Sequence, residues 1–415
     1  MKSLPLMLGC LLAGVIPAAG ADDSFDRLDE ALTWSGNHDL WRERLSGSLD
    51  LEGYYFQLPA PGLIHADRGT LLEPRLALFL DAQLGPRIYI FAQSRVDRGF
   101  DPGEGGLRAR LDEYAVRVTP WAGGLVNLQF GKFATIAGNW ARRHQSWDNP
   151  FITAPLPYDN LTGIFDGSAA NSAPALLRWS HLGPTAIGSG EYFGQYRSPV
   201  LWGPSYASGA SVSGAFGRFD YALELKNASL SSRPDSWDAT RIQWSHPTFT
   251  GRLGYRPDES WDLGLSASSG PYLQPSAAPT LAAGYGLGDY REVVFGQDVG
   301  FAWHHLQFWA ECYEATFEIP RVGNAGTVAY YLEAKYKFTP QCFGALRWNQ
   351  QLYGTIPDGL GGNVPWGPNV WRIDVAPGYR FTAHAEVKLQ LSLLHGSPGP
   401  REYSRLSAAQ FVLRF

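Results

Sequence analysis

Hydrophobic and polar residues alternate along this chain from about residue 45 to its end. In 385–393, for example, Ala, Val and three Leu residues occupy one set of alternate positions, and Glu386, Lys388 and Gln390 occupy the other. The segments 72–84, 87–97 and 328–338 show the same pattern. A period of two is the period of a β-strand whose faces meet different surroundings, so the pattern predicts an all-β chain.

The composition of the two faces indicates what those surroundings are. The polar face carries both signs of charge on strand after strand, whereas Tyr, Trp and Phe gather near the strand ends of the apolar face. A soluble β-sandwich also alternates, but this combination is typical of a membrane-spanning barrel with a wet interior. No apolar run of the ~18–20 residues needed for a spanning helix follows residue 21. A membrane-spanning chain of this kind must therefore form a closed barrel.

The connections between the predicted strands alternate between short turns and long Gly- and Pro-rich segments, as in up-and-down barrels. One strand for each gap gives about 18 antiparallel strands over 44–415, with 16 as the alternative. The least certain pair is the hairpin formed by 175–182 and 185–196. Consecutive acidic residues Asp112 and Glu113 interrupt the alternation and indicate a β-bulge or a position at the barrel rim.

The first residues resemble a secretory signal. Lys2 supplies the positive charge, 4–16 is an apolar core, and Ala19-Gly20-Ala21 is a small-residue cleavage site, so we expect residues 1–21 to be removed.

The segment 22–43 is not strand-like. Phe25, Leu28 and Leu32 fall at helical spacing. We expect a short helix at the periplasmic mouth of the barrel or inside its lumen, with a partly ordered leader as the alternative.

Composition excludes some functions. The 415 residues carry a net charge of −5 and show no basic stripe, so we expect no nucleic-acid partner. Cys312 and Cys342 lie on predicted strands two apart, about 9–10 Å from each other, so we expect no disulfide. No phosphate-binding loop, dinucleotide fingerprint or Cys/His metal cluster is present, and we expect no cofactor and no metal.

The end of the chain resembles a known signal. Phe411, Leu413 and Phe415 alternate, and the chain stops at Phe415. This ending is similar to the terminal strand of bacterial outer-membrane proteins, and it implies recognition by the barrel-assembly machinery. The region 44–415 as a whole resembles a porin-type barrel, with the general porins and the phosphate-selective type O/P-like porins as the nearest comparison.

The longest irregular stretch, 135–174, follows the fifth predicted strand and is therefore the third external loop. In porins this loop commonly folds into the barrel and narrows the pore. Its aromatic content argues against disorder, so we expect it to fold inward, with an external cap as the alternative. The candidate constriction residues are Trp140, Arg142, Arg143, Trp147 and Asp148.

Selectivity of a pore depends on the charges that line it. Predicted lumen charges of both signs are nearly balanced, so we expect weak charge selectivity. The residues with the clearest lumen positions are Arg75, Asp81, Arg95, Glu333, Lys335, Arg372, Glu386 and Lys388.

The sequence thus predicts a porin of the Gram-negative outer membrane for passive transport of small hydrophilic solutes, including ions. Its partners would be outer-membrane lipids, the assembly machinery and those solutes, and the assembly that we consider is a homotrimer. Two alternatives stay open. One is a carbohydrate-selective pore with an aromatic path of Trp140, Trp147, Trp309 and Tyr331, and the other is a structural or adhesion barrel with a blocked lumen.

An enzyme is less well supported by the sequence. His384 with Glu386, and His144 near Ser146 and Asp148, are the only suggestive groups, and neither lies in a nucleophile motif such as G-x-S-x-G. We therefore expect no catalysis.

Overall fold

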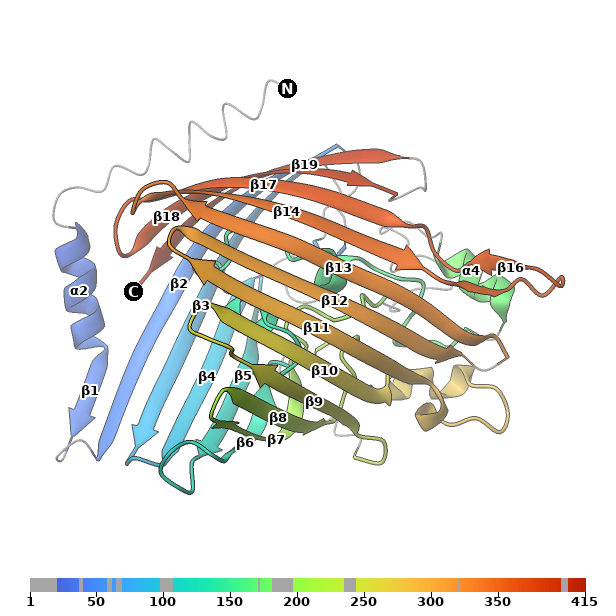
Figure 1. Cartoon of the computed structure of the whole chain (residues 1–415), viewed down its shortest axis with the longest axis horizontal. Helices are drawn as coiled ribbons and strands as arrows, with labels where there is room; N and C mark the ends of the chain where they lie inside the picture. Colours follow the sequence, from blue (N-terminus) through green and yellow to red (C-terminus); the bar gives the residue numbers. More distant parts are fainter. Residues whose placement is uncertain are drawn as a thin grey trace.

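The computed structural model describes residues 21–36, 40–57, 62–64, 69–97, 107–170, 172–180, 197–234, 244–319, 321–396 and 402–415. Among these residues, one antiparallel sheet of 17 strands closes on itself, because the last strand, β19, pairs with β2 (Figure 1). Sixteen strands form the closed wall, and the short β1 is an extra strand beside the start of β2. The predicted cleavable segment 1–21 lies, but for its last residue, outside the described residues.

The strands follow one another around the wall in chain order. They are β1 (Thr33–Gly36), β2 (Trp41–Phe56), β3 (Thr70–Leu84), β4 (Ile88–Asp97), β5 (Arg108–Val118), β6 (Asn127–Phe133), β7 (Ala207–Phe216), β8 (Phe219–Lys226), β9 (Thr248–Tyr255), β10 (Trp261–Pro271), β11 (Arg291–Trp303), β12 (Leu306–Ile319), β13 (Gly323–Lys337), β14 (Cys342–Tyr353), β17 (Val370–Arg380), β18 (Ala385–His395) and β19 (Tyr403–Arg414). A separate hairpin of β15 (Thr355–Pro357) and β16 (Asn363–Pro365) extends from the loop between β14 and β17.

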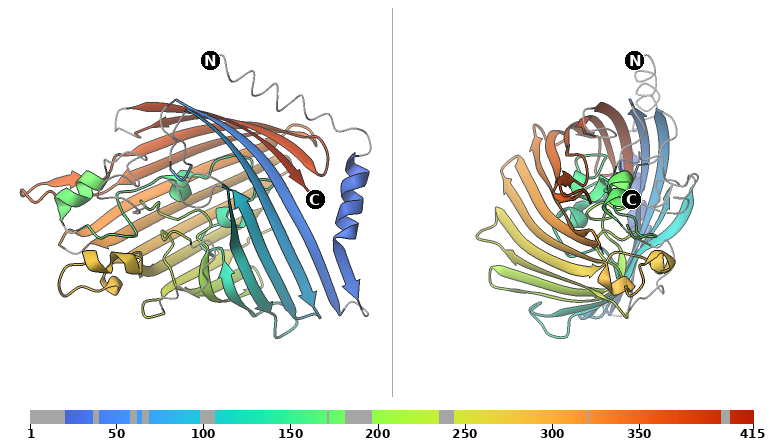
Figure 2. Two further views of the ribbon diagram at one scale, coloured as in Figure 1. Left: turned by 180° about the vertical axis from the view of Figure 1, so that it is seen from behind. Right: turned by 90° about the vertical axis from the view of Figure 1, so that its right-hand side faces the viewer.

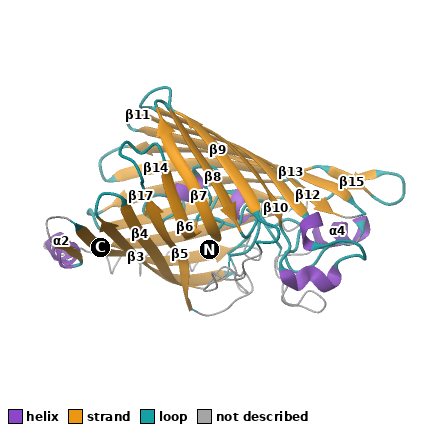
Figure 3. Cartoon of the chain, turned by 90° about the horizontal axis from the view of Figure 1, so that it is seen from below, coloured by secondary structure: helices purple, strands orange, loops and turns teal. Residues whose placement is uncertain are grey.

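The short helices lie at the two ends of the barrel. Helix α2 (Ala21–Ala31) is beside the end that carries the short turns, and α4 (Ala173–Ser180) is at the opposite end (Figure 3). We call these the turn end and the loop end. The other helices are η1 (Trp140–Arg143), α3 (Leu156–Asp159), η4 (Pro275–Thr280) and η5 (Leu287–Asp289). In the described part of the chain, no helix has the length and apolarity needed to cross a membrane.

The prediction of an up-and-down barrel of 16 to 18 strands with a short N-terminal helix is confirmed. The closed wall has 16 strands, which was the alternative to 18. The predicted strand 175–182 differs, because its described residues lie in α4. Ala173, Leu176 and Trp179 are buried at a spacing of three residues, which is the period of a helix face and not of a strand. The second half of that hairpin lies outside the described residues.

Helix α2 is outside the lumen, at the turn end (Figure 1). Asp26 is 3.1 Å from His384 Nε2, and the Phe25 ring stacks on the His384 ring at 5.4 Å. Of the two positions considered for the helical segment, the structure shows the one beside the mouth.

The interruption at Asp112 and Glu113 is a β-bulge. Gln93 pairs with Glu113 and the next residue, Ser94, pairs with Leu111, so Asp112 is the extra residue. As a result both carboxylates face the lumen.

The outward face of the wall is apolar. Leu332 is 46% exposed and Leu391 is 57% exposed, as expected of side chains that contact lipid. Exposed aromatic rings lie outside the turn end, including Phe216, Trp303 and Phe338. They form one of the two aromatic girdles that such barrels carry at the membrane interfaces.

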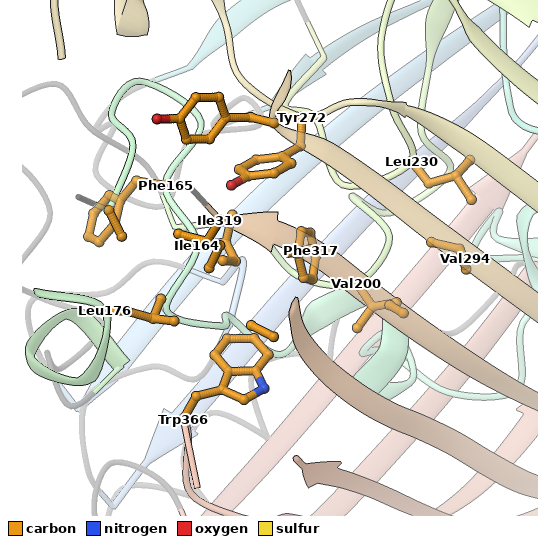
Figure 4. Packing of buried hydrophobic residues seen from close by; sticks show 14 of the residues in the cluster. Ile164, Phe165, Leu176, Val200, Leu230, Tyr272, Val294, Phe317, Ile319 and Trp366 are labelled. Carbon is orange, nitrogen blue, oxygen red and sulfur yellow. The ribbon is translucent and has the colours of Figure 1, made fainter. Parts of the chain in front are cut away.

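The alternation inverts in the loop-end half of β12. There Glu314 is exposed on the outside, whereas Phe317 and Ile319 are buried inside. These inner residues belong to an apolar core with Leu176, Tyr272 and other loop residues (Figure 4). This half of β12 therefore packs like a soluble protein, which indicates that it extends beyond the membrane.

The lipid-facing register can be tested on β18. Leu391→Arg should lower the free energy of unfolding by about 2–4 kcal/mol, because it places a charge near the middle of the apolar band. Urea titration of the protein folded into lipid vesicles measures this loss. Leu391→Ala is the control for side-chain size and should be much milder. Equal stability of Leu391→Arg and the parent would contradict the register.

Candidate functional site: a lumen narrowed by the third loop

The third loop leaves the wall partway along the barrel. Strand β6 has seven residues and pairs only with the turn-end half of β5. The chain then turns inward. The backbone N–H of Ala134 donates to Glu113 at 2.6 Å, and the hydroxyl of Thr135 donates to Glu224 at 2.8 Å. Figure 2 shows the loop segments inside the ring of strands. The loop runs to the start of β7 at Ala207, which makes it longer than the predicted 135–174.

A carboxylate of β12 anchors the first part of the loop. Glu311 accepts the backbone N–H groups of Asn139 and Trp140, both at 2.6 Å, and the hydroxyl of Tyr158 at 2.5 Å. The preceding Gly138 has φ +70°, and a Cβ there would lie 2.0 Å from the Tyr313 hydroxyl. Only glycine allows the backbone to approach Glu311 so closely.

The next contact is made by Arg143. Its guanidinium donates to Glu333 at 2.6 Å and to the Tyr331 hydroxyl at 3.1 Å, and it lies 4.3 Å from the centre of the Trp309 ring. Glu333 is fully buried. This ion pair is therefore a fixed attachment of the loop and not a mobile pore charge.

The loop then follows the wall from β18 back to β14. Lys388 donates to the carbonyls of Ser146 and Asn149, the latter at 2.9 Å. Gln390 accepts the N–H groups of Ile152 and Thr153 at 2.7 and 3.1 Å. Wall side chains thus satisfy backbone groups that have no partner within the loop.

Two arginines complete this attachment. Arg347 donates to the Thr153 carbonyl at 2.9 Å and pairs with Asp374 at 2.9 Å. Arg372 pairs with Asp159 in the loop at 3.1 Å. Both guanidinium groups are buried, so this side of the lumen is filled.

Open space remains on the other side of the loop. An outer chamber of about 190 Å³ lies between the loop and β2–β5, and Arg75, Trp140 and His144 are among its lining residues. An inner chamber of about 450 Å³, on the turn-end side of η1, is lined by Phe91, Arg142, His144 and others. A second inner chamber of about 770 Å³ lies near the turns of β8–β11.

His144 lines both the outer chamber and the 450 Å³ chamber, so its side chain stands between them. We call this boundary the neck. The Nδ1 of His144 is 2.6 Å from the Ala141 carbonyl, and Nε2 is 2.7 Å from the Tyr206 hydroxyl. These contacts fit a neutral ring that donates from Nδ1 and accepts at Nε2. Burial, followed by nearby Arg95, lowers the pKa of His144 to about 3.

The wall faces His144 across the neck with two residues of β4. Gln145 donates to Gln93 at 3.0 Å, and Arg95 donates to Gln145 at 3.4 Å. The boundary between the two chambers is therefore formed by hydrogen-bonded neutral groups, with one arginine at its edge.

Arginines on adjacent strands line the outer chamber. Arg75, Arg95 and Arg110 come from β3, β4 and β5. Each is paired with a carboxylate: Arg75 with Glu52 at 3.1 Å, Arg95 with Asp112 at 3.2 Å and Arg110 with Asp97 and Asp112. The bulge residue Asp112 thus neutralises two of them.

The five predicted constriction residues are separated along the loop. Trp140 is buried against Tyr158, Arg142 is exposed to the 450 Å³ chamber, and Arg143 is bound to the wall. Trp147 lies near the turn end between Arg380 and Arg414, and Asp148 is exposed. Of the five, Trp140 lines the outer chamber and Arg142 lines the 450 Å³ chamber, whereas Gln93 and Tyr206, which form the neck, were not predicted.

All eight predicted lumen residues lie on lumen-facing positions of their strands, but they differ in their surroundings. Glu333, Arg372 and Lys388 hold the loop. The others pair within the wall: Arg75 with Glu52, Arg95 with Asp112, Glu386 with Arg380, Asp81 with Tyr89, and Lys335 with the ring of Phe343.

The four aromatic residues of the predicted carbohydrate path do not form a continuous surface. Trp309 is covered by Arg143, and Trp147 lies at the turn end on the far side of the loop. Tyr331 is fully buried.

The residues weighed for catalysis are bound to other groups. Ser146 donates to Asp50 and not to His144, whereas His384 contacts Asp26 and Glu386 pairs with Arg380. Over the described ranges, no group of three or more His, Cys, Asp or Glu side chains is arranged to hold a metal ion.

Comparisons with known proteins place the fold. No protein-family model matches the chain, and no curated protein is similar in sequence. Among solved structures, OmpF of Salmonella typhi in complex with daunomycin has a TM-score of 0.58 at 10% identity, over 92% of this chain and 100% of that one. The anion-selective porin from Comamonas acidovorans has a TM-score of 0.54 at 12% identity, over 90% and 100%. The trimer form of OmpT, an outer membrane protein of Vibrio cholerae, has a TM-score of 0.54 at 8% identity, over 91% and 100%.

These similarities establish the architecture. At sequence identities of 8–12%, they show a shared fold and do not show a shared function. The chain folds as a porin-type β-barrel of the kind found in bacterial outer membranes.

The anchor at Glu311 can be tested directly. Glu311→Gln removes the negative charge that strengthens the bonds to the two loop N–H groups, and it turns the oxygen that accepts the Tyr158 hydroxyl into a donor. We expect a loss of about 1–3 kcal/mol in the free energy of unfolding, together with larger fluctuations of single-channel current. Glu314→Gln, on the outward face of the same strand, is the matched control. A Glu311→Gln protein with parental stability and parental current noise would show that the loop does not depend on this anchor.

Proposed function

We propose that this protein is an outer-membrane porin through which small hydrophilic solutes diffuse passively. The observation that carries the proposal is that the outer chamber and the 450 Å³ chamber lie on the two sides of one side chain, His144. In this proposal the two chambers connect past His144 and form a route along β2–β5, beside the loop.

Charge in this route supports weak selectivity. The three arginines of the outer chamber are each balanced by carboxylates. The groups at the neck are neutral apart from Arg95. Ions in a narrow passage respond strongly to unbalanced charge, and little is present at this level of the lumen.

The barrel exterior supports the location. Its apolar outer face with exposed rings at the turn end suits lipid, and the turn end would face the periplasm. Assembly by the barrel-assembly machinery through Phe411, Leu413 and Phe415, and association as a homotrimer, belong to the same proposal. The hydrogen bonds of 2.9 and 3.0 Å between the backbones of Phe415 and Gly47 of β2, at the seam that closes the barrel, support this role for Phe415.

A structural barrel with a blocked lumen is the second candidate. Packing on one side of the lumen favours it, because an apolar core occupies the loop end and buried arginines bind the loop there. The two candidates differ in whether the neck conducts.

Conductance through the neck distinguishes them. The purified parent should form ion-conducting channels in planar bilayers. Tyr206→Ala should raise the single-channel conductance, because it removes a side chain from the neck. Tyr206→Phe keeps the ring, loses only the hydroxyl and should conduct nearly like the parent. A folded parent protein that forms no channels would favour the blocked barrel. Equal conductance of the parent and both variants would show that ions do not pass beside His144.

A further inference from the structure

The 450 Å³ chamber has an unusual charge balance for this lumen. Two arginines, Arg117 and Arg142, line it, and both are exposed to it. Neither is within ion-pair distance of a carboxylate among the described residues. Arg117 donates only to the side chain of Gln129, at 2.8 and 3.0 Å. Arg142 makes no hydrogen bond with any described residue.

The carboxylates around this chamber are already engaged. Glu113, the one carboxylate that lines it in the described chain, accepts the N–H of Ala134 at 2.6 Å. Asp220, Asp262 and Asp298 act on Arg142 at longer range, and all three also pair with Arg252, at 3.0, 3.8 and 2.7 Å. The described lining thus sets two arginines against one carboxylate, Glu113, so positive charge is in excess in this chamber.

Aromatic rings form another part of the same wall. Phe79, Phe91 and Phe133, from β3, β4 and β6, line the chamber. The guanidinium of Arg117 lies 6.0 Å from the centre of the Phe91 ring and 5.8 Å from that of Tyr89. Apolar rings at inward positions are not needed to fasten the loop, and the alternation of a wet barrel favours polar residues there.

We propose that this chamber binds small organic monocarboxylates with an apolar or aromatic body as they pass through the barrel. A guanidinium group binds a carboxylate through two parallel N–H bonds. The phenyl rings would cover the apolar body of the same molecule. The volume lies within the range of small-molecule sites. This inference rests on the proposed function, because the ligand reaches the chamber through the conducting route.

If the site binds carboxylates in this way, the barrel should favour anions modestly, although positive and negative charges are nearly balanced over the lumen as a whole. The outer chamber selects little, because its arginines are paired. The 450 Å³ chamber, on the turn-end side of the neck, adds Arg117 and Arg142, neither of which has an ion-pair partner among the described residues. Selection would occur there, on the turn-end side of the loop.

The test uses benzoate and acetate as probes. Single channels of the full protein are recorded in KCl, and potassium benzoate or potassium acetate is added to both compartments. Benzoate should reduce the chloride current at lower concentrations than acetate does. Arg142→Gln should raise the half-blocking concentration of benzoate about tenfold, the loss expected for one charge-assisted hydrogen-bonded contact.

Matched variants distinguish the contribution of charge to benzoate binding from that of apolar contact. Arg256→Gln removes an exposed arginine from the other inner chamber and should leave benzoate block unchanged. Phe91→Ala should weaken block by benzoate and leave acetate block and the chloride-to-potassium permeability ratio unchanged. The test is placed on Arg142 and not on Arg117, because Arg117 holds Gln129 whereas Arg142 makes no hydrogen bond with any described residue.

Equal block of the parent by benzoate and acetate would overturn the inference, as would parental benzoate block in Arg142→Gln. Either result leaves the porin function intact, because the channel still conducts. A folded parent that carries no current would overturn both the porin function and this site.

Discussion

A backbone that leaves a β-sheet inside a membrane must find hydrogen-bond partners, and this constraint shapes the whole lumen. The third loop leaves the wall after the seven residues of β6 and crosses the barrel. Its N–H and carbonyl groups cannot rely on strand pairing there. Wall side chains supply the partners instead, with Glu311, Lys388 and Gln390 as the clearest cases.

The lumen is asymmetric, because one part of the wall binds the third loop and another part borders open chambers. The wall from β12 to β18 is occupied with holding the loop, and at the loop end it continues into an apolar core that contains Phe317 and Trp366 (Figure 4). The wall from β2 to β5 pairs its charges within itself and borders the outer chamber. A single barrel thus combines a packed interior on one side with open chambers on the other.

The alternation of residues predicted the barrel because it reports directly on the two faces of each strand. It also located the bulge at Asp112, since an extra residue in a strand disturbs a period of two. Charge alone could not show which lumen residues face water. Arg142 and Arg143 are neighbours in sequence, yet one is exposed to a chamber and the other is bound to Glu333. That difference depends on a strand roughly 190 residues away, which no local pattern reveals.

The short helix α4 shows another limit. Its segment has enough apolar residues for a strand, and the turn-like sequences on either side suited a hairpin. Only the burial of Ala173, Leu176 and Trp179 together identifies a helical face. Gln93 and Tyr206 were missed for a related reason, because they are uncharged and become important only where the loop meets β4.

The central claim is that a fixed loop leaves an open route past His144, and thiol modification at position 142 tests it most directly. Arg142→Cys would be made in a Cys312→Ala, Cys342→Ala background and recorded as single channels, with a small methanethiosulfonate reagent added to one compartment and then, in a fresh membrane, to the other. Position 142 lies on the turn-end side of the neck, so an open route predicts a stepwise change of current from either side. Reaction from one side alone, or no change while the unfolded protein is fully modified, would contradict an open route past His144.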